Sequence, residues 1–290
     1  MLPQANVPVI SVVVPTCDRA EPLGQCLAAV SPGMQEIAAS LYEVIVSDDS
    51  VGDATRQLVE DRFPWARWVA GPRRGPAANR NRGASEARGT WLVFTDDDCL
   101  PSRQWMSALW RAAQEGSAHA LEGKVISDPA PSNPWDEAPL NLEGGLFWSC
   151  NVAVRRDVFL AIGGFDENYR HAAMEDVDLR TTLQAAGRRI LFVADAIVNH
   201  PSRRATFRLK LRHMQRFYSQ IYFHRKWHRA TPLAAFVAMV RAVTRFWLVT
   251  PLRTRRGIAT PILLYVLAIV ALCAGFAPWY RRAGRELAGL

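Results

Sequence analysis

The chain has 290 residues and a formal net charge of +8 at pH 7, and its length allows one large α/β domain with an appendage or two modest domains. A composition of 49% hydrophobic and 21% charged residues, without a biased tract, excludes collagen-like, low-complexity and wholly disordered chains. Its five cysteines are scattered without a Cys-x-x-Cys pair, which argues against a disulfide framework or a thiolate zinc site and favours a reducing compartment.

The first 200 residues alternate between predicted strands and predicted helices. Three β-branched runs predict strands, at 9–14, 42–47 and 91–95, and two segments predict helices, at 21–30 and 53–62. This alternation indicates βαβ units in an α/β domain with a largely parallel sheet and helices on both faces. All three runs end in polar, mostly acidic residues at the carboxyl edge, where such sheets bind their ligands.

Three adjacent carboxylates, Asp96, Asp97 and Asp98, follow the third predicted strand. They repel one another unless a cation or a hydrogen-bond donor compensates them, and a hard divalent metal would do so. In an extended chain, Asp96 and Asp98 would point to one side and Asp97 to the other. An acidic turn or helix cap ahead of Pro101 is the alternative interpretation.

A second acidic cluster opens a helix that is predicted to run from Glu175 to Gly187. Leu179 and Leu183 mark its buried stripe, and a turn of 100° per residue places Glu175 and Asp176 on the same inward side. The same geometry places Asp178 and Arg180 on the outer side. The alternative is an acidic first turn that complements the helix dipole. That alternative explains one inward carboxylate more easily than two.

Charge is divided unevenly along the chain. Residues 1–202 hold 18 of the 35 basic and 26 of the 27 acidic side chains, whereas residues 203–290 hold 17 basic side chains and only Glu286 as an acid. A strongly basic segment of this kind usually meets an anionic partner, either nucleic acid or the headgroups of a cytoplasmic leaflet.

Apolar segments accompany the basic charge and favour a membrane over nucleic acid. Residues 206–229 predict a basic amphipathic helix on the membrane surface. Residues 232–251 suit an interfacial helix, because Arg241 and Arg245 share one helical face. The charge-free residues 257–280 are long enough to cross roughly 30 Å of hydrocarbon. A buried core helix and a basic helix packed on the globular part are the alternatives, and crossing, re-entrant and interfacial topologies all stay open.

Three parts are therefore expected along the chain. Residues 1–202 form the α/β domain, residues 203–230 a basic amphipathic helical linker, and residues 231–290 hydrophobic membrane-associated helices. The first residues lack the charged and apolar regions of a secretion signal. We therefore expect the globular part to work on the cytoplasmic face of the inner cell membrane.

Ordered motifs extend over about two thirds of the chain. They are Val12–Thr16 with Asp18-Arg19, Val44–Ser50, Pro76–Gly83, Phe94–Asp98, Asn151–Arg156, Gly163–Asp166 and Glu175–Leu179. No single motif is specific, but their order and spacing in one chain are. Together they resemble the motifs of family 2 glycosyltransferases with the GT-A fold, of the type that builds bacterial surface polysaccharides.

The resemblance implies an inverting enzyme that moves a sugar from a nucleotide diphosphate donor to a hydroxyl of a lipid-linked or polysaccharide acceptor in cell-envelope glycan synthesis. It implies donor-binding roles for Pro15, Thr16, Asp18, Arg19, Asp48, Asp49, Asn79, Arg80, Asp96 and Asp97. It implies that Mg²⁺ or Mn²⁺ is held by Asp98, Asp96 and His200, that Asp176 beside Glu175 is the general base, and that Trp148 and Asn151 face the acceptor.

Other interpretations compete with these roles. A lone histidine such as His200 is often structural, an arginine on a loop such as Arg80 is often only solvated, and a tryptophan such as Trp148 is often part of a core. Nucleotidyltransferases and dinucleotide-dependent oxidoreductases would need a Gly-rich loop after the first strand, which this chain lacks. A membrane-bound protein that binds a sugar nucleotide or an anionic lipid without turnover stays open. No nucleic-acid partner is expected.

Overall fold

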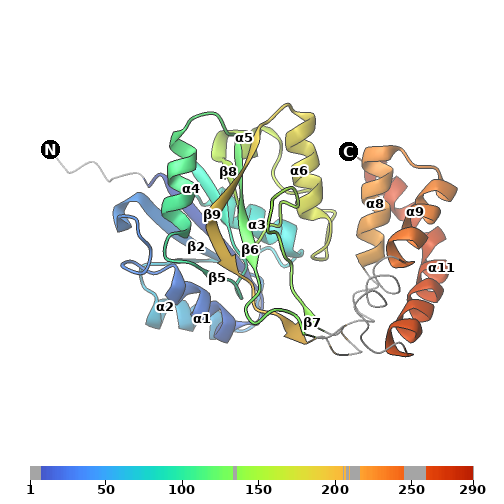
Figure 1. The fold of residues 1–290 in the computed structure, drawn as a ribbon, viewed down its shortest axis with the longest axis horizontal. Coiled ribbons are helices and arrows are strands. Elements are labelled where there is room, and N and C mark those ends of the chain that lie inside the picture. The colour runs from blue at the N-terminus through green and yellow to red at the C-terminus, as the bar shows by residue number, and fades with distance from the viewer. Residues whose placement is uncertain are drawn as a thin grey trace. The chain divides into compact units, whose positions relative to one another are not determined.

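The computed structural model describes residues 8–132, 136–204, 206, 209, 216–244 and 259–289. The chain divides into two compact units. The first unit comprises Met1–Ala130, Ala138–Arg170 and Glu175–Pro201, and the second comprises Pro131–Glu137, His171–Met174 and Ser202–Leu290. Figure 1 shows a sheet flanked by helices in the first unit and a group of helices in the second.

An eight-stranded sheet forms the centre of the first unit, in the order β3-β2-β1-β4-β8-β6-β9-β5. Its β1, β2 and β4 are the three strands that the sequence predicts, and β1 pairs in parallel with both neighbours. Strand β8 runs antiparallel to β4 and β6, so the sheet is mixed but mostly parallel, as expected. The strands are β1 Ile10–Thr16, β2 Tyr42–Asp48, β3 Arg67–Ala70, β4 Trp91–Phe94, β5 Leu100–Pro101, β6 Ala120–Ile126, β8 Val152–Arg155 and β9 Ile190–Asn199.

Helices cover both faces of this sheet, which explains why its central strands are apolar on both sides. Successive residues of a strand point to opposite faces, so Val12 and Val14 join one hydrophobic cluster and Val13 joins the other. The helices of this unit are α1 Ala20–Ala29, α2 Ala54–Arg62, α3 Pro76–Ser85, α4 Trp105–Gln114, α5 Arg156–Ala161 and α6 Glu175–Ala185, with a short 3₁₀ turn at Ala39–Leu41. The α/β class is therefore confirmed, and the carboxyl ends of β1, β2 and β4 lie at one edge.

Within the described residues of the second unit, the helices are α8 Phe217–His228, α9 Pro232–Thr244 and α11 Ala259–Ala288. They pack around a shared core of Phe217, Ile221, Met239, Val243, Ala268 and Leu272. A two-stranded sheet also belongs to this unit and pairs β7 Asp136–Glu137 with β10 Arg203–Arg204. Most of the proposed basic helix before residue 216, and the apolar residues 245–258 with Arg245, lie outside the described residues.

One face of α11 is packed and another is open. Ala268 and Leu272 are buried in the three-helix core, whereas Val266 and Val270 are exposed. Within the described residues, the stretch Tyr265–Ala288 of α11 is long and apolar enough to cross a membrane, by length and composition alone. One face of α11 is therefore buried like that of a core helix, and the other face is exposed.

Candidate active site

Polar side chains from neighbouring strand ends meet at the carboxyl edge of the sheet. Thr16 ends β1 and donates its hydroxyl hydrogen to Oδ2 of Asp97, at 2.8 Å. Asp48 ends β2 and accepts hydrogen bonds from Nε1 of Trp68 at 3.0 Å and from the backbone N–H of Ser50 at 2.9 Å. The expected donor residues Thr16, Asp48 and Asp97 therefore lie along one edge, because parallel strands end together.

Asn79 on α3 ties the ends of β1 and β2 together. Its Nδ2 donates to the carbonyl oxygens of Thr16, at 3.1 Å, and Ser47, at 3.0 Å, while its Oδ1 accepts from the Ser47 hydroxyl at 2.6 Å. The amide of Asn79 thus forms its hydrogen bonds within the protein, and it holds together the two strand ends that carry the other expected donor-binding residues.

Asp18 and Asp49 occupy the loops that follow β1 and β2. The backbone N–H of Asp18 donates to the Ser50 hydroxyl at 2.7 Å, and Asp18 has a left-handed φ of 52°. Asp49 accepts from the backbone N–H of Arg73 at 2.8 Å, and burial raises the pKa of its carboxyl. Pro15 is buried within β1 one residue before the strand ends.

The three adjacent carboxylates do not continue the extended strand. The backbone N–H of Cys99 donates to the carbonyl oxygen of Asp96 at 3.1 Å and closes a turn. Arg19 therefore binds both Asp97, at 2.6 Å, and Asp98, at 2.7 Å. The alternation expected of an extended chain therefore does not apply to these three residues, because the chain turns at Asp96.

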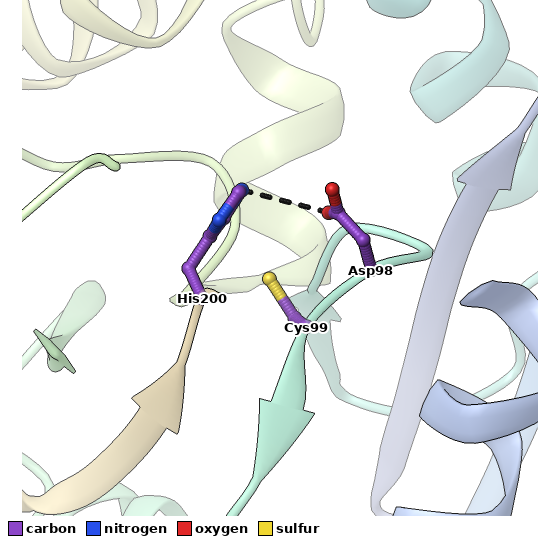
Figure 2. A group of neighbouring side chains, drawn as sticks. All are labelled: Asp98, Cys99 and His200. Atoms are coloured by element: carbon purple, nitrogen blue, oxygen red, sulfur yellow. Dashed lines mark ion pairs between the residues drawn. The ribbon is translucent and has the colours of Figure 1, made fainter. Parts of the chain in front are cut away.

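Asp98, Cys99 and His200 form a cluster with ligand atoms that lie within 4.8 Å of one another (Figure 2). Nε2 of His200 is 3.5 Å from Oδ1 of Asp98, and Figure 2 shows the imidazole ring and the carboxylate facing each other. The antiparallel pairing of Leu100 in β5 with Asn199 in β9 creates this cluster, because it brings the residues beside that pair together. Residues about a hundred positions apart are thus joined by one strand pair.

Two members of this cluster suit a divalent cation. A carboxylate oxygen is a ligand that Mg²⁺ and Mn²⁺ favour, and an imidazole nitrogen adds a ligand common to transition metals. Burial and the contact with Cys150 raise the pKa of the Cys99 thiol well above its usual value, so this thiol stays neutral and is a poor ligand for a hard ion. The chemistry of Asp98 and His200 therefore fits the expected metal.

Arg80 connects the two acidic clusters that the sequence predicts separately. Its guanidinium lies 2.6 Å from Oδ1 of Asp96 and 3.2 Å from Oε1 of Glu175, and it lies over the ring of Phe165. Arg80 is 3% exposed, so the interpretation of a solvated arginine is wrong. Because one guanidinium reaches both carboxylates, the turn after β4 and the start of α6 belong to a single site.

Asp176 stands beside this arginine at the start of α6. Burial raises the pKa of Asp176 to about 6. Three contacts lower this pKa and only partly offset burial: the backbone N–H of Val177, which donates to Oδ1 at 2.8 Å, the charge of Arg80, and the backbone N–H of Ser149. Burial and the charge of Asp176 likewise raise the pKa of Glu175, while Arg80 lowers it. The helix end favours ionised Asp176, but burial opposes it, so this carboxyl titrates nearer to neutrality than an exposed aspartate.

The two residues expected to face the acceptor differ in their surroundings. Trp148 is half-buried, and its Nε1 donates to the carbonyl oxygen of Leu140 at 3.1 Å. Asn151 is buried, and its Nδ2 donates to the carbonyl oxygens of Lys124 and Ala196, at 2.9 and 2.8 Å. Its Oδ1 also accepts from Trp105 at 2.8 Å. Asn151 therefore holds sheet segments together, and Trp148 is the one of the pair that reaches the surface.

Sequence reasoning missed Glu122, a buried carboxylate in β6. It accepts hydrogen bonds from the backbone N–H groups of Gly145, at 2.8 Å, Leu146, at 2.7 Å, and Phe147, and from Nδ2 of Asn141 at 2.8 Å. The available signal was a lone acid inside a run that otherwise reads as a buried strand. Glu122 fixes the loop that leads to Trp148.

Comparison with known proteins gives consistent family matches. A model described as glycosyl transferase family 2 matches residues 11–162, and one described as glycosyl transferase family group 2 matches residues 125–280. Validoxylamine A glucosyltransferase of Streptomyces hygroscopicus subsp. jinggangensis is 29% identical over 227 residues, which cover 63% of this chain and 53% of that protein. This chain thus spans about half the length of the Streptomyces protein.

Two further proteins are similar over more of their length. N-acetylglucosaminyl-diphospho-decaprenol L-rhamnosyltransferase of Mycobacterium tuberculosis strain H37Rv is 29% identical over 257 residues, which cover 69% of this chain and 83% of that protein. A mannosyltransferase of Pyrobaculum calidifontis, solved with GDP-Man and Mn²⁺, is 21% identical with a TM-score of 0.56, over 97% of this chain and 79% of that one. At this identity the structural likeness shows the fold.

Proposed function

Because the chain belongs to glycosyl transferase family 2 and has the GT-A fold, we propose that it transfers a sugar from a nucleotide diphosphate donor to a hydroxyl of an acceptor, with inversion. The observation that carries this proposal is the bridge that Arg80 forms between Asp96 and Glu175. It unites a donor-binding edge with a buried carboxyl pair that can take a proton. A protein that only binds a sugar nucleotide would need the first of these and has no use for the second.

The donor side uses the strand ends of β1, β2 and β4. Asp98 and His200 would hold Mg²⁺ or Mn²⁺, and the cation would neutralise charge on the leaving diphosphate. Arg19 forms ion pairs with Asp97 and Asp98 and so orients both carboxylates. Arg80 pairs in the same way with Asp96, the carboxylate we assign to the donor's ribose. The base and ribose are assigned to the remaining side chains at this edge, Pro15, Thr16, Asp18, Asp48 and Asp49.

The acceptor side uses Asp176 as the general base. Its carboxylate accepts the proton of the acceptor hydroxyl as that oxygen attacks the sugar from the face opposite the diphosphate. A pKa raised to about 6 makes this carboxylate more basic than an exposed aspartate while leaving it ionised at neutral pH. Glu175 is held by Arg80 and positions the start of α6. One attack by one acceptor inverts the anomeric centre.

The test of this function is a screen of purified full-length protein with labelled nucleotide sugars and Mn²⁺. A cognate donor is expected to raise the melting temperature, since it binds the folded state, and to pass its label to acceptor lipid or glycan only when the metal is present. Undiminished transfer in the presence of a chelator would refute the metal site. Donor binding without transfer to any acceptor would support the non-catalytic alternative.

We place the protein at the cytoplasmic face of the inner membrane, where a lipid-linked acceptor would lie. The Mycobacterium relative is named for a decaprenol-linked substrate, and exposed Val266 and Val270 stand on the same helix as Arg281 and Arg285. Apolar and basic side chains on one helix suit an anionic bilayer surface. An enzyme held in the plane of its acceptor meets it at a higher effective concentration.

Full-length protein is accordingly expected to remain with membranes through a high-salt wash and to be released by detergent. Salt screens the arginines but leaves apolar contacts with lipid intact. Quantitative immunoblotting of the fractions checks this. Recovery of the protein in the salt-soluble fraction without detergent would contradict an apolar anchor.

A further inference from the structure

The loop from Leu140 to Trp148, here called the leucine loop, exposes three aliphatic side chains. Leu140 and Leu146 are each 40% exposed, and Leu142 is 54% exposed. Single exposed leucines are ordinary on protein surfaces, but three within seven residues concentrate exposed apolar side chains on one loop. Neither the donor site nor the general base uses these side chains.

Hydrogen bonds hold this loop in place. Asn141 exchanges two backbone hydrogen bonds of 2.9 Å with Val125 at the end of β6, so Leu140 and Leu142, on either side of Asn141, point to the same face. Glu122 then binds three successive backbone N–H groups, including that of Leu146 at 2.7 Å. The leucines are therefore presented by a fixed backbone and are not free to fold inward.

The leucine loop adjoins the general base. Arg180 on α6 donates to the carbonyl oxygen of Gly145, and the backbone N–H of Ser149, directly after the loop, is bonded to Asp176 at the start of the same helix. Leu146 precedes Ser149 by three residues, a length of chain that spans at most about 10 Å. Leu146 therefore lies near the position that the acceptor hydroxyl would take at Asp176.

We propose that the leucine loop binds the hydrocarbon chain of a lipid-linked acceptor, an inference that rests on the proposed function and narrows its acceptor class. Aliphatic side chains form no hydrogen bonds, so they cannot satisfy the hydroxyls of a sugar. A prenyl chain that packs against them is stabilised, because its apolar surface is removed from water. Because the leucine loop adjoins the general base Asp176, we assign the molecule that it binds to the acceptor. Glu122 is the residue that positions this surface.

The test uses full-length protein in detergent micelles and a triple variant with Leu140→Gln, Leu142→Gln and Leu146→Gln. Leu160→Gln is the matched control, because Leu160 is 53% exposed on α5 of the same unit. Binding is measured with a decaprenyl-diphosphate sugar and with the same sugar diphosphate on a butyl chain. The triple variant is expected to bind the decaprenyl probe more than tenfold more weakly, and to bind the butyl probe and the nucleotide donor as the wild type does.

Each other outcome has a definite meaning. Unchanged affinity for the decaprenyl probe, or an equal loss with the butyl probe, overturns the proposal. An equal loss of binding to vesicles without acceptor also overturns it, because the leucine loop would then bind the bilayer itself. A change in oligomeric state overturns it as well, because the leucine loop would then bind a second copy of the chain. Wild-type protein that binds the decaprenyl probe through these leucines but transfers no sugar would uphold the proposal and defeat the proposed function.

Discussion

Replacing Asp176 with asparagine is expected to lower kcat by about 10²- to 10⁴-fold, the usual contribution of a positioned general base. Asparagine matches aspartate in shape, and its oxygen can still accept the backbone N–H groups of Val177 and Ser149 that hold the carboxylate. It cannot take a proton from the acceptor hydroxyl. The loss should therefore fall on kcat, while the dissociation constant of the donor stays close to that of the wild type.

The measurement is steady-state transfer with saturating donor and Mn²⁺, together with donor binding and melting temperature for both proteins. A kcat within tenfold of the wild type would remove Asp176 from the role of base. A matching fall in donor affinity or in melting temperature would show that the side chain acts through structure.

Replacing Arg80 with methionine is expected to lower the free energy of unfolding by about 3–5 kcal/mol, the cost of breaking a buried ion pair from one side. The change leaves Asp96 and Glu175 without the guanidinium that lies 2.6 and 3.2 Å from them. Glu175 would then take up a proton more readily, because Arg80 lowers its pKa. Arg80→Lys keeps one charge but not the two-pronged geometry, so its loss should be intermediate.

Arg82→Met provides the matched control on the same helix. The Arg82 side chain is 39% exposed and pairs with Glu86 one turn along, and surface pairs of this kind contribute about 0–1 kcal/mol. Urea unfolding, followed by circular dichroism, compares the three variants. Equal destabilisation by Arg80→Met and Arg82→Met would show that the bridge between the two acidic clusters carries no special weight.

Local sequence patterns predict much of this fold. The β-branched runs that became β1, β2 and β4 and the acidic first turn of α6 depend on short-range preferences. A periodicity of 3.6 residues correctly placed Glu175 and Asp176 on the buried side. It wrongly placed Asp178 on the outer side, because this carboxylate is 2% exposed and accepts a hydrogen bond from the Tyr169 hydroxyl at 3.1 Å. The proximity of Glu175 and Asp176 to the Asp96 turn depends on Arg80, which is 95 residues from Glu175. No local pattern reports a contact over that distance.

The errors have the same origin. The alternating arrangement of Asp96, Asp97 and Asp98 requires the strand to continue through Asp98. The backbone N–H of Cys99 instead donates to the carbonyl oxygen of Asp96 and closes a turn, and Asp98 forms an ion pair with Arg19. Glu122 passed unnoticed because its partners are backbone N–H groups of a loop more than twenty residues away. Such hydrogen bonds depend on the path of the backbone, so the amino-acid sequence near Glu122 does not reveal them.

The dependence of kcat on pH tests the central claim most directly, because a base must be deprotonated before it can act. The pKa of Asp176 is raised to about 6, so the account predicts a plateau above that pH and, below it, a fall in kcat that approaches tenfold per pH unit. The residual activity of Asp176→Asn should lack this limb. A wild-type kcat that stays constant down to roughly pH 5, or a variant that keeps the same acidic limb, would contradict the assignment.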